Sequence, residues 1–346
     1  MAFSASRFLG AVGLGAGALL AVRSVQRQLN RCDFHGKTVL ITGGSRGLGL
    51  VLARQLAAEG AELILCARHG DELERAAREL TASGAQVQTH VCDITDRDQV
   101  EPMIQSIIAE RGRLDVVINN AGIIQTGPLE SMTCEDYEEA LQTHLFGPMT
   151  VNRAVIPHMR NRQSGRIVNI SSIGGLISVP HLLPYCTSKF ALVGYSLGLR
   201  NELERDGIRV TTVCPGLMRT GSPRNATFKG QNRAEYAWFK IASSIPFVTL
   251  SAESAARQAI DGCRFGDALV VLGYQTKLIA KLAALAPGLT YDLLALTARL
   301  LPGFGGIGTN SARGWQSETP LTESPLTALT NTAARQNNEI PGTAGV

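Results

Sequence analysis

Short apolar runs rich in β-branched residues recur from residue 37 onward, and each is followed by a longer stretch with a different pattern. Runs of this length that end at glycine or polar residues are typical of buried strands. They predict seven strands, over residues 37–42, 62–67, 86–91, 114–119, 166–171, 208–214 and 268–273.

The intervening stretches place apolar residues three or four positions apart, which is the spacing of an amphipathic helix. They predict helices over residues 48–59, 71–83, 97–110, 135–160 and 185–205. Strands and helices that alternate in this way predict an α/β fold. We expect a single doubly wound, parallel, seven-stranded Rossmann sheet with helices on both faces, built from residues 35–274.

The segment ahead of this alternation, residues 1–34, is apolar and basic. Residues 8–22 contain 15 residues without a charge, and no acid precedes Asp33. As a helix those residues would span about 22 Å, against about 30 Å of bilayer hydrocarbon. Three alternatives stay open: an uncleaved membrane anchor that leaves the catalytic domain in the cytoplasm, a cleaved presequence, and a soluble extension.

The chain after the last predicted strand divides into two parts. Residues 275–305 contain two apolar helical patterns, 277–286 and 290–301, and predict a C-terminal helical extension. These helices either cap the core, the commoner outcome, or rest on a membrane surface. Residues 306–346 are rich in Thr, Ser, Asn, Pro and Gly, which predicts a disordered tail because so little apolar surface cannot offset the ordering entropy.

Composition and charge narrow the function classes. The chain has 33 basic and 29 acidic residues. Four arginines and no acid lie in residues 1–32, so the remainder carries 29 of each sign and no net charge. That balance argues against nucleic acid as a partner. The 7 cysteines and 6 histidines lack metal-binding spacing, which predicts reduced thiols and no metal site.

The first predicted strand runs into a glycine-rich turn, Thr42-Gly43-Gly44-Ser45-Arg46-Gly47-Leu48-Gly49. Glycines let a pyrophosphate approach the backbone, and the N-terminus of the following helix stabilises its charge. A strand, a glycine turn and a helix in this order predict a dinucleotide site. The second strand ends at Arg68 instead of an acid, and Arg68 with Arg46 favours a 2′-phosphate, so we expect NADP(H) rather than NAD(H).

A second cluster carries the reaction chemistry. Tyr185 and Lys189 are four residues apart at the start of a predicted helix, so they share one face. The lysine ammonium favours tyrosinate, and we expect it to lower the pKa of the Tyr185 phenol toward neutrality. A phenol tuned in this way can donate a proton to a carbonyl oxygen. The strand over 166–171 ends at Ser171 and Ser172, whose hydroxyls would meet the same oxygen.

Together these motifs resemble the short-chain dehydrogenase/reductase family over residues 36–273. TGGSRGLG (42–49), CDITD (92–96), NNAG (119–122), YCTSK (185–189) and PGLMRT (215–220) resemble its signature segments, and Ser172 precedes Tyr185 by the family's spacing. The resemblance implies that Tyr185 is the general acid and base, that Lys189 binds the nicotinamide ribose and that Ser172 orients the carbonyl. It further implies cofactor contacts at Gly43, Ser45, Arg46, Gly47, Leu48, Gly49, Arg68, Asp93, Ile94, Asn119, Ala121, Gly122, Pro215, Gly216 and Thr220. By analogy with the family, the two long helices would pair subunits in a homodimer or homotetramer.

His144 departs from the family pattern, which usually places an asparagine there to hold a water in the proton relay. Histidine also forms hydrogen bonds, so His144 is either a catalytic relay residue or a packed bystander.

The resulting prediction is an NADPH-dependent oxidoreductase that interconverts a ketone or aldehyde with an alcohol. We expect a mobile lid over residues 217–247, and its apolar residues suit a lipophilic carbonyl or alcohol unless they pack among themselves: Phe228, Tyr236, Trp238, Phe239 and Ile245. Two alternatives are a catalytically weak NADP-binding regulatory protein and a membrane-peripheral scaffold of the same fold.

Overall fold

The structure is a computed structural model, and it describes residues 21–340. Residues 1–20 of the predicted N-terminal segment therefore lie outside the described residues. Residues 21–29 are helical and are tied to the body by Arg27, whose guanidinium lies 2.8 Å from the carboxylate of Asp267.

The central element is a parallel sheet with the strand order β11-β7-β6-β4-β1-β2-β3. All five residues of β1 are buried, because helices cover both faces and each side chain of a strand faces one of them. The seven predicted strands are confirmed, with differences only at their ends: β1 (Thr38–Thr42), β2 (Glu62–Ala67), β3 (Val87–Val91), β4 (Val116–Asn119), β6 (Gly165–Ile170), β7 (Ile208–Cys214) and β11 (Leu269–Val271).

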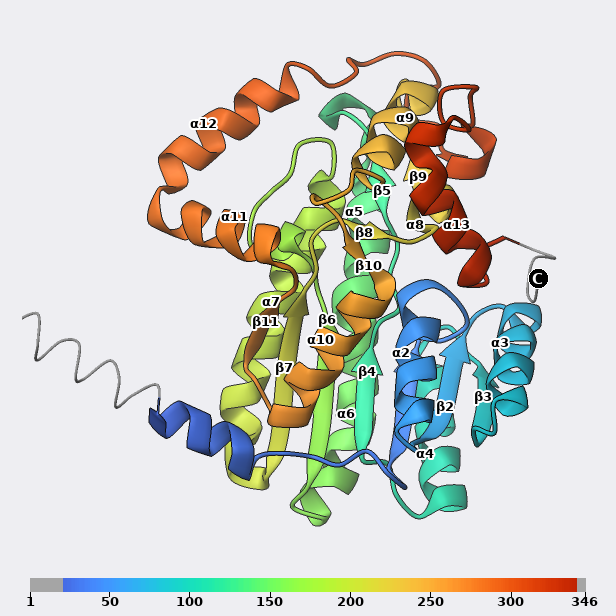
Figure 1. Ribbon diagram of the computed structural model, residues 1–346, viewed down its shortest axis with the longest axis vertical. Helices are drawn as coiled ribbons and strands as arrows, with labels where there is room; N and C mark the ends of the chain where they lie inside the picture. The colour runs from blue at the N-terminus through green and yellow to red at the C-terminus, as the bar shows by residue number, and fades with distance from the viewer. Residues whose placement is uncertain (1–20, 341–346) are drawn as a thin grey trace, which may run out of the picture.

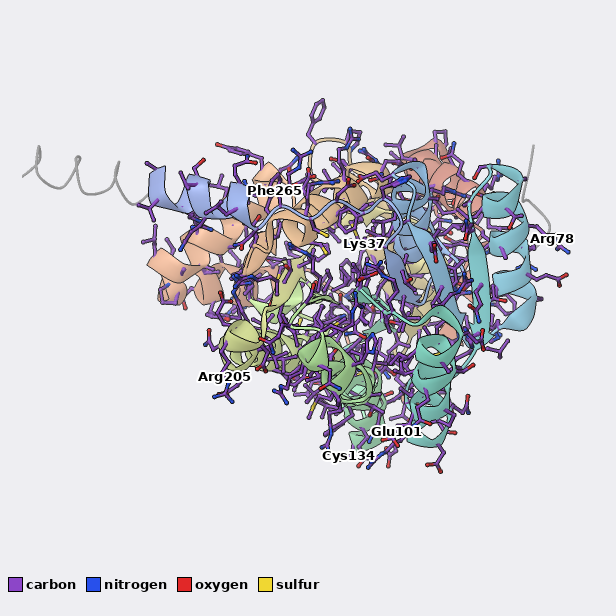
Figure 2. All side chains as sticks on the ribbon, turned by 90° about the horizontal axis from the view of Figure 1, so that it is seen from below. Lys37, Arg78, Glu101, Cys134, Arg205 and Phe265 are labelled. Atoms are coloured by element: carbon purple, nitrogen blue, oxygen red, sulfur yellow. The ribbon has the colours of Figure 1, made fainter. Side chains whose placement is uncertain are left out.

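The helices form two layers (Figure 1). α2, α3 and α10 pack on one face of the sheet, and α4, α6 and α7 pack on the other. In Figure 2, Phe265 of α10 and Glu101 of α4 accordingly lie on opposite sides of the molecule. The doubly wound prediction is confirmed by these helices: α2 (Gly47–Ala58), α3 (Gly70–Ala82), α4 (Arg97–Arg111), α5 (Cys134–Leu141), α6 (Gly147–Asn161), α7 (Leu183–Leu203) and α10 (Ala252–Phe265).

The helix predicted over residues 135–160 is interrupted. A π-helical stretch, Gln142–Phe146, separates α5 from α6 and contains His144. One extra residue per turn changes which side chains face the sheet, and such interruptions are frequent at functional sites.

Short elements cover the carboxyl ends of the strands (Figure 1). They form two small sheets, β10-β8 and β12-β9-β5, and three helices. Their bounds are β5 (Gln125–Thr126), β8 (Met218–Arg219), α8 (Ser222–Asn225), β9 (Thr227–Phe228), α9 (Asn232–Ala242), β10 (Leu250–Ser251), β12 (Ala312–Arg313) and α13 (Ala328–Gln336).

The prediction of a disordered tail is wrong for residues 306–340. β12 pairs antiparallel with β9, and α13 lies beside α9 and above α2 and α3 (Figure 1). The tail has no apolar core of its own, and polar side chains hold it to the body instead. Lys240 Nζ of α9 lies 3.0 Å from the Glu323 carboxylate, and Arg224 lies 2.5 Å from Glu318. The composition of a segment does not reveal the charged side chains elsewhere in the chain, such as Lys240 and Arg224, that can hold it in place.

Residues 275–305 form two helices, and of the two alternatives for them the structure does not favour capping of the core. α11 (Tyr274–Leu285) buries only Thr276, and α12 (Pro287–Ala298) buries no residue. In Figure 1 both helices project from the body. Among the described helices none is long and apolar enough to cross a membrane alone, whereas α11 and α12, which meet at 117°, reach that length and composition only as a pair.

Candidate active site

A cavity of about 520 Å³ opens where the strands end. It collects nearly all the predicted site residues, although they come from segments far apart in sequence. Those that line it are Gly43, Ser45, Arg46, Gly47, Leu48, Arg68, Asp93, Ile94, Ala121, Gly122, His144, Ser172, Tyr185, Lys189, Pro215, Gly216 and Thr220.

The glycine turn forms one end of this cavity. Gly43 has φ +64°, and a Cβ there would lie 2.9 Å from Ala121 Cα. A Cβ on Gly49 would collide with the Gly43 carbonyl oxygen, so Gly49 lets α2 approach the turn and does not itself line the cavity. The turn therefore leaves room above the N-terminus of α2 that side chains would fill. A glycine turn that opens a helix in this way is typical of sites for the phosphates of a dinucleotide.

Asn119 does not line the cavity, contrary to what the resemblance implies. Its amide nitrogen donates to the side-chain oxygens of Asn152 and Asn169, each at 2.8 Å, in the buried core below the site. Asn120 lies at the cavity instead, and its amide donates at 3.1 Å to the carbonyl oxygens of Thr42 and Gly43. Asn119 and Asn120 therefore brace the glycine turn and the strand ends.

Two arginines stand at the adenosine end. Arg46 Nη1 lies 2.7 Å from a carboxylate oxygen of Glu72, which also accepts a hydrogen bond from Ser45 Oγ at 3.1 Å. Arg68 is half-exposed, and its guanidinium lies 3.9 Å from Asp93. Both arginines line the cavity. Glu72 was missed by the sequence reasoning, which treated the helix over 71–83 only as a structural element.

Ser172, Tyr185 and Lys189 converge at the centre. Ser172 follows β6, and its Oγ accepts the Gly174 N–H at 3.0 Å and also hydrogen-bonds Tyr185. Lys189 Nζ donates to the Ile170 carbonyl at 3.0 Å and lies 5.7 Å from the centre of the Tyr185 ring. The first turns of α7 thus carry the phenol and the amine, and the end of β6 supplies the hydroxyl.

The electrostatics of this centre differ from the prediction. Burial raises the pKa of Tyr185 above its usual range, and the Ser172 hydrogen bond only partly offsets that effect. Burial also lowers the pKa of Lys189 to about 7. The expected fall of the Tyr185 pKa toward neutrality is therefore wrong for the protein alone, because desolvation disfavours the charged form of both groups.

His144 is buried, and both ring nitrogens have partners. Nε2 accepts the Ile123 N–H at 3.1 Å, so the proton lies on Nδ1, 2.7 Å from Ser188 Oγ. Ser188 Oγ in turn donates to the Tyr185 carbonyl at 2.8 Å. Burial, followed by the nearby Lys189, holds the pKa of His144 well below its usual value. These contacts suit a neutral side chain that positions Tyr185.

The predicted lid residues divide into three groups. Trp238 and Phe239 line the cavity, whereas Phe228 and Tyr236 are fully buried and pack against Phe239. Ile245 is exposed. Apolar side chains that line the same cavity, and that were not singled out from the sequence, are Ile123, Ile124, Val179, Leu182, Leu217, Met218, Val248 and Ile279.

The comparisons agree with this geometry. Residues 37–229 match the family described as short chain dehydrogenase. A putative oxidoreductase, SadH, from Mycobacterium tuberculosis is 34% identical over 268 residues, which is 76% of this chain and 95% of that protein. Dehydrogenase/reductase SDR family member 7B of Mus musculus is 32% identical over 287 residues, covering 80% of this chain and 86% of that protein.

Solved structures give the same result. A short-chain dehydrogenase from Streptomyces avermitilis aligns with a TM-score of 0.65 and 30% identity, over 76% of this chain and 98% of that one. A metagenomic short-chain oxidoreductase in complex with NADP aligns with a TM-score of 0.57 and 27% identity, over 70% of this chain and all of that one. This chain is an NAD(P)-binding oxidoreductase by fold and site. It belongs to the short-chain dehydrogenase/reductase family.

Proposed function

We propose that this chain is an NADPH-dependent carbonyl reductase or alcohol dehydrogenase in which Tyr185 moves the proton. One observation carries the proposal: Tyr185, Ser172 and Lys189 meet at the floor of a cavity whose other end is a glycine turn. The dinucleotide supplies hydride chemistry when bound. The substrate oxygen lies within reach of Ser172 Oγ and the Tyr185 hydroxyl, which gives its proton in reduction and takes it back in oxidation.

Lys189 supports Tyr185 through charge. Both groups are buried, and a protonated Lys189 favours the tyrosinate that remains after proton transfer. The other cofactor contacts are proposed at the cavity-lining residues given above, with Asp93 and Ile94 at the adenine and Thr220 near the nicotinamide.

NADP(H) is the preferred cofactor in this proposal because Arg46 and Arg68 flank the adenosine end and no acid follows β2 directly. Glu72 sits between Arg46 and Ser45. A 2′-phosphate would replace that carboxylate as the partner of Arg46.

The apolar wall of the cavity and the exposed apolar surface next to it support a lipophilic substrate. Ile279 of α11 and Val248 line the cavity and are about half exposed, and next to them Phe247 is 88% exposed. The exposed leucines of α11 and α12 continue this apolar surface, so we propose that both helices rest on a membrane and that substrate enters from there. The helix over residues 21–29 leads toward the N-terminal segment, a second proposed membrane contact.

Pairing of subunits is proposed through the face of α6 and α7, where Phe146 and Phe190 are exposed. Size-exclusion chromatography with light scattering tests it directly: a monomer at micromolar concentration contradicts it.

The activity is tested with purified full chain, NADPH and a panel of ketones and aldehydes that ranges from short and polar to long and apolar, read by loss of the reduced nicotinamide absorbance. We expect kcat/KM to rise with substrate chain length. No turnover of any carbonyl, despite NADPH binding, would favour the catalytically weak regulatory protein instead.

A further inference from the structure

The last described residues cross the cavity next to the glycine turn. We name residues 336–340 the C-terminal strap. The carbonyl oxygen of Asn337 accepts the Gly47 N–H at 2.9 Å, at the first residue of α2. The amide nitrogen of Asn338 donates to the Ser45 carbonyl at 2.8 Å and to the Glu72 carbonyl at 3.0 Å. The strap is therefore bonded to the backbone of the turn that defines the dinucleotide site.

Two arginines on the body hold the strap in this place. Arg54 of α2 donates at 2.7 Å both to the Asn337 side-chain oxygen and to the Gln336 carbonyl. Arg75 of α3 donates to the Asn338 side-chain oxygen at 2.9 Å. Asn337 and Asn338 are buried as a result. These six hydrogen bonds to two helices and a turn are a built contact rather than a chance approach of a chain segment.

Glu339 carries the strap to the opposite side of the cavity. Its carboxylate accepts the Gly221 N–H, between β8 and α8, and its side chain lines the cavity. A Cβ on Gly47 would lie 3.3 Å from Glu339 Oε1, so the carboxyl group lies close against the glycine turn. Glu339 is only 6% exposed. An acid therefore lines the cavity beside the glycine turn that would receive a dianionic diphosphate.

The surroundings of Glu339 favour its neutral form. Burial raises its pKa to about 7; the Gly221 N–H, the Arg46 guanidinium and the Asn225 side chain oppose that shift, and the Glu72 carboxylate adds to it. A diphosphate bound beside the carboxyl group would add negative charge and raise the pKa further. A protonated carboxyl group can instead donate a hydrogen bond to a phosphate oxygen.

We propose that the C-terminal strap is part of the dinucleotide site, that it covers the diphosphate, and that Glu339 is protonated whenever the diphosphate is bound. This inference rests on the proposed function, since it takes the dinucleotide as the ligand. It adds a ligand-facing residue from the end of the chain, remote from every sequence motif of the site.

The proposal has a measurable consequence, because binding takes up a proton that the free protein lacks above pH 7. The Kd for NADPH should rise by about tenfold per pH unit above pH 7. Calorimetric titration at pH 8, in two buffers with different ionisation heats, should show uptake of about one proton per NADPH bound. Neither readout depends on turnover.

Glu339→Gln is the decisive variant, since glutamine imitates the neutral acid in size and hydrogen bonding. We expect its Kd for NADPH to match the wild type at pH 6.5 and to be about tenfold tighter than the wild type at pH 8. Lys189 also titrates near pH 7, but its effect persists in Glu339→Gln, so the difference between the two proteins isolates Glu339. Glu130→Gln, on the exposed surface, is the matched control and should behave as the wild type.

A chain that ends at residue 336 tests the covering role. At pH 6.5 its NADPH should dissociate about tenfold faster, which corresponds to the loss of one good hydrogen bond. The same pH dependence in the wild type and Glu339→Gln overturns the role of Glu339. Tighter binding by the shortened chain at pH 6.5 overturns the covering role, since the strap would then exclude the cofactor. If no variant binds NADPH at any pH, the proposed function itself fails.

Discussion

The cavity has two contrasting sides: the glycine turn, and a C-terminal side formed by the C-terminal strap. The two are built by different means. On the first side, contiguous residues at the end of β1 present backbone groups, and Gly43 and Gly49 are required by the close approach of Ala121 and of the turn itself. On the second side, single side chains arrive from far away: Asn338 is 293 residues from Ser45, whose carbonyl it binds. One side is local in sequence and the other is assembled only by folding.

Because the two sides are built differently, substitutions in them should have different effects. The glycine-turn side depends on backbone geometry that a few residues fix, and the catalytic centre next to it depends on two consecutive turns of α7. The C-terminal side depends on many polar contacts of modest strength, each worth about 0.5–1.5 kcal/mol. Substitutions near the glycine turn and Tyr185 should therefore change kcat strongly, whereas substitutions in the C-terminal strap should change the affinity for the dinucleotide moderately.

The largest effect is expected at the catalytic centre. Tyr185→Phe removes the hydroxyl and preserves the ring that packs against His144 at 5.5 Å. kcat should fall by at least about 100-fold because the general acid is lost, while the Kd for NADPH stays near the wild-type value. Steady-state kinetics and fluorescence titration measure the two quantities separately. Near wild-type kcat in this variant would show that another group moves the proton.

Cofactor choice should respond next most strongly. Arg68→Asp should reverse a preference for NADP(H) over NAD(H), with a loss of about 10- to 150-fold in NADPH affinity, since a charge-assisted phosphate contact is worth about 1.5–3 kcal/mol. Arg78→Asp, on the outer face of α3, is the control and should leave both dissociation constants unchanged. Equal affinity of the wild type for the two cofactors contradicts the prediction.

The same contrast decides which parts of the fold and of the site can be predicted from the sequence. Periodicity and short motifs encode the strands and the proposed catalytic residues Ser172, Tyr185 and Lys189, and the structure brings these three residues together. Residues 306–340 were predicted to be disordered because their composition offers no core, yet Arg54 and Lys240 supply partners that no local pattern reveals. Glu339 was missed for the same reason: nothing near it in sequence resembles a site.

The proposed membrane surface gives a third test, since α11 and α12 expose large apolar side chains and α11 is bonded to the body through Gln275, which donates to the Phe247 carbonyl. Leu285 and Leu300 are 84% and 83% exposed. Leu285→Asp with Leu300→Asp should weaken binding to phospholipid vesicles by at least about tenfold, because each buried leucine contributes about 1.5–3 kcal/mol.

Vesicle flotation measures that binding, and turnover of a short soluble ketone should stay within about twofold. Removal of residues 1–31 is the companion variant, because the catalytic motifs begin only at Thr42. A full chain that does not bind vesicles contradicts both proposed membrane contacts. Binding that survives the double substitution and is lost on truncation assigns the contact to the N-terminal segment.

Only a small effect on activity is expected at His144, which lies beside Tyr185. Its neutral ring bonds Ile123 and Ser188, so His144→Asn should keep kcat within about threefold and lower the free energy of unfolding by about 1–2 kcal/mol through a lost hydrogen bond. Because its pKa is well below the usual value, His144 stays neutral from pH 6 to 9, and the pH profile of kcat should not move.

In the unfolded chain this histidine takes up a proton below about pH 6.5, whereas in the folded protein it does not. The wild type should therefore lose stability as the pH falls below 6.5, by up to about 1.4 kcal/mol per pH unit, and His144→Asn should lose less. Urea unfolding at pH 5.5 and 7.5 measures this difference. A shifted pH profile of kcat with unchanged acid stability would mean that His144 exchanges protons during turnover and is a relay residue after all.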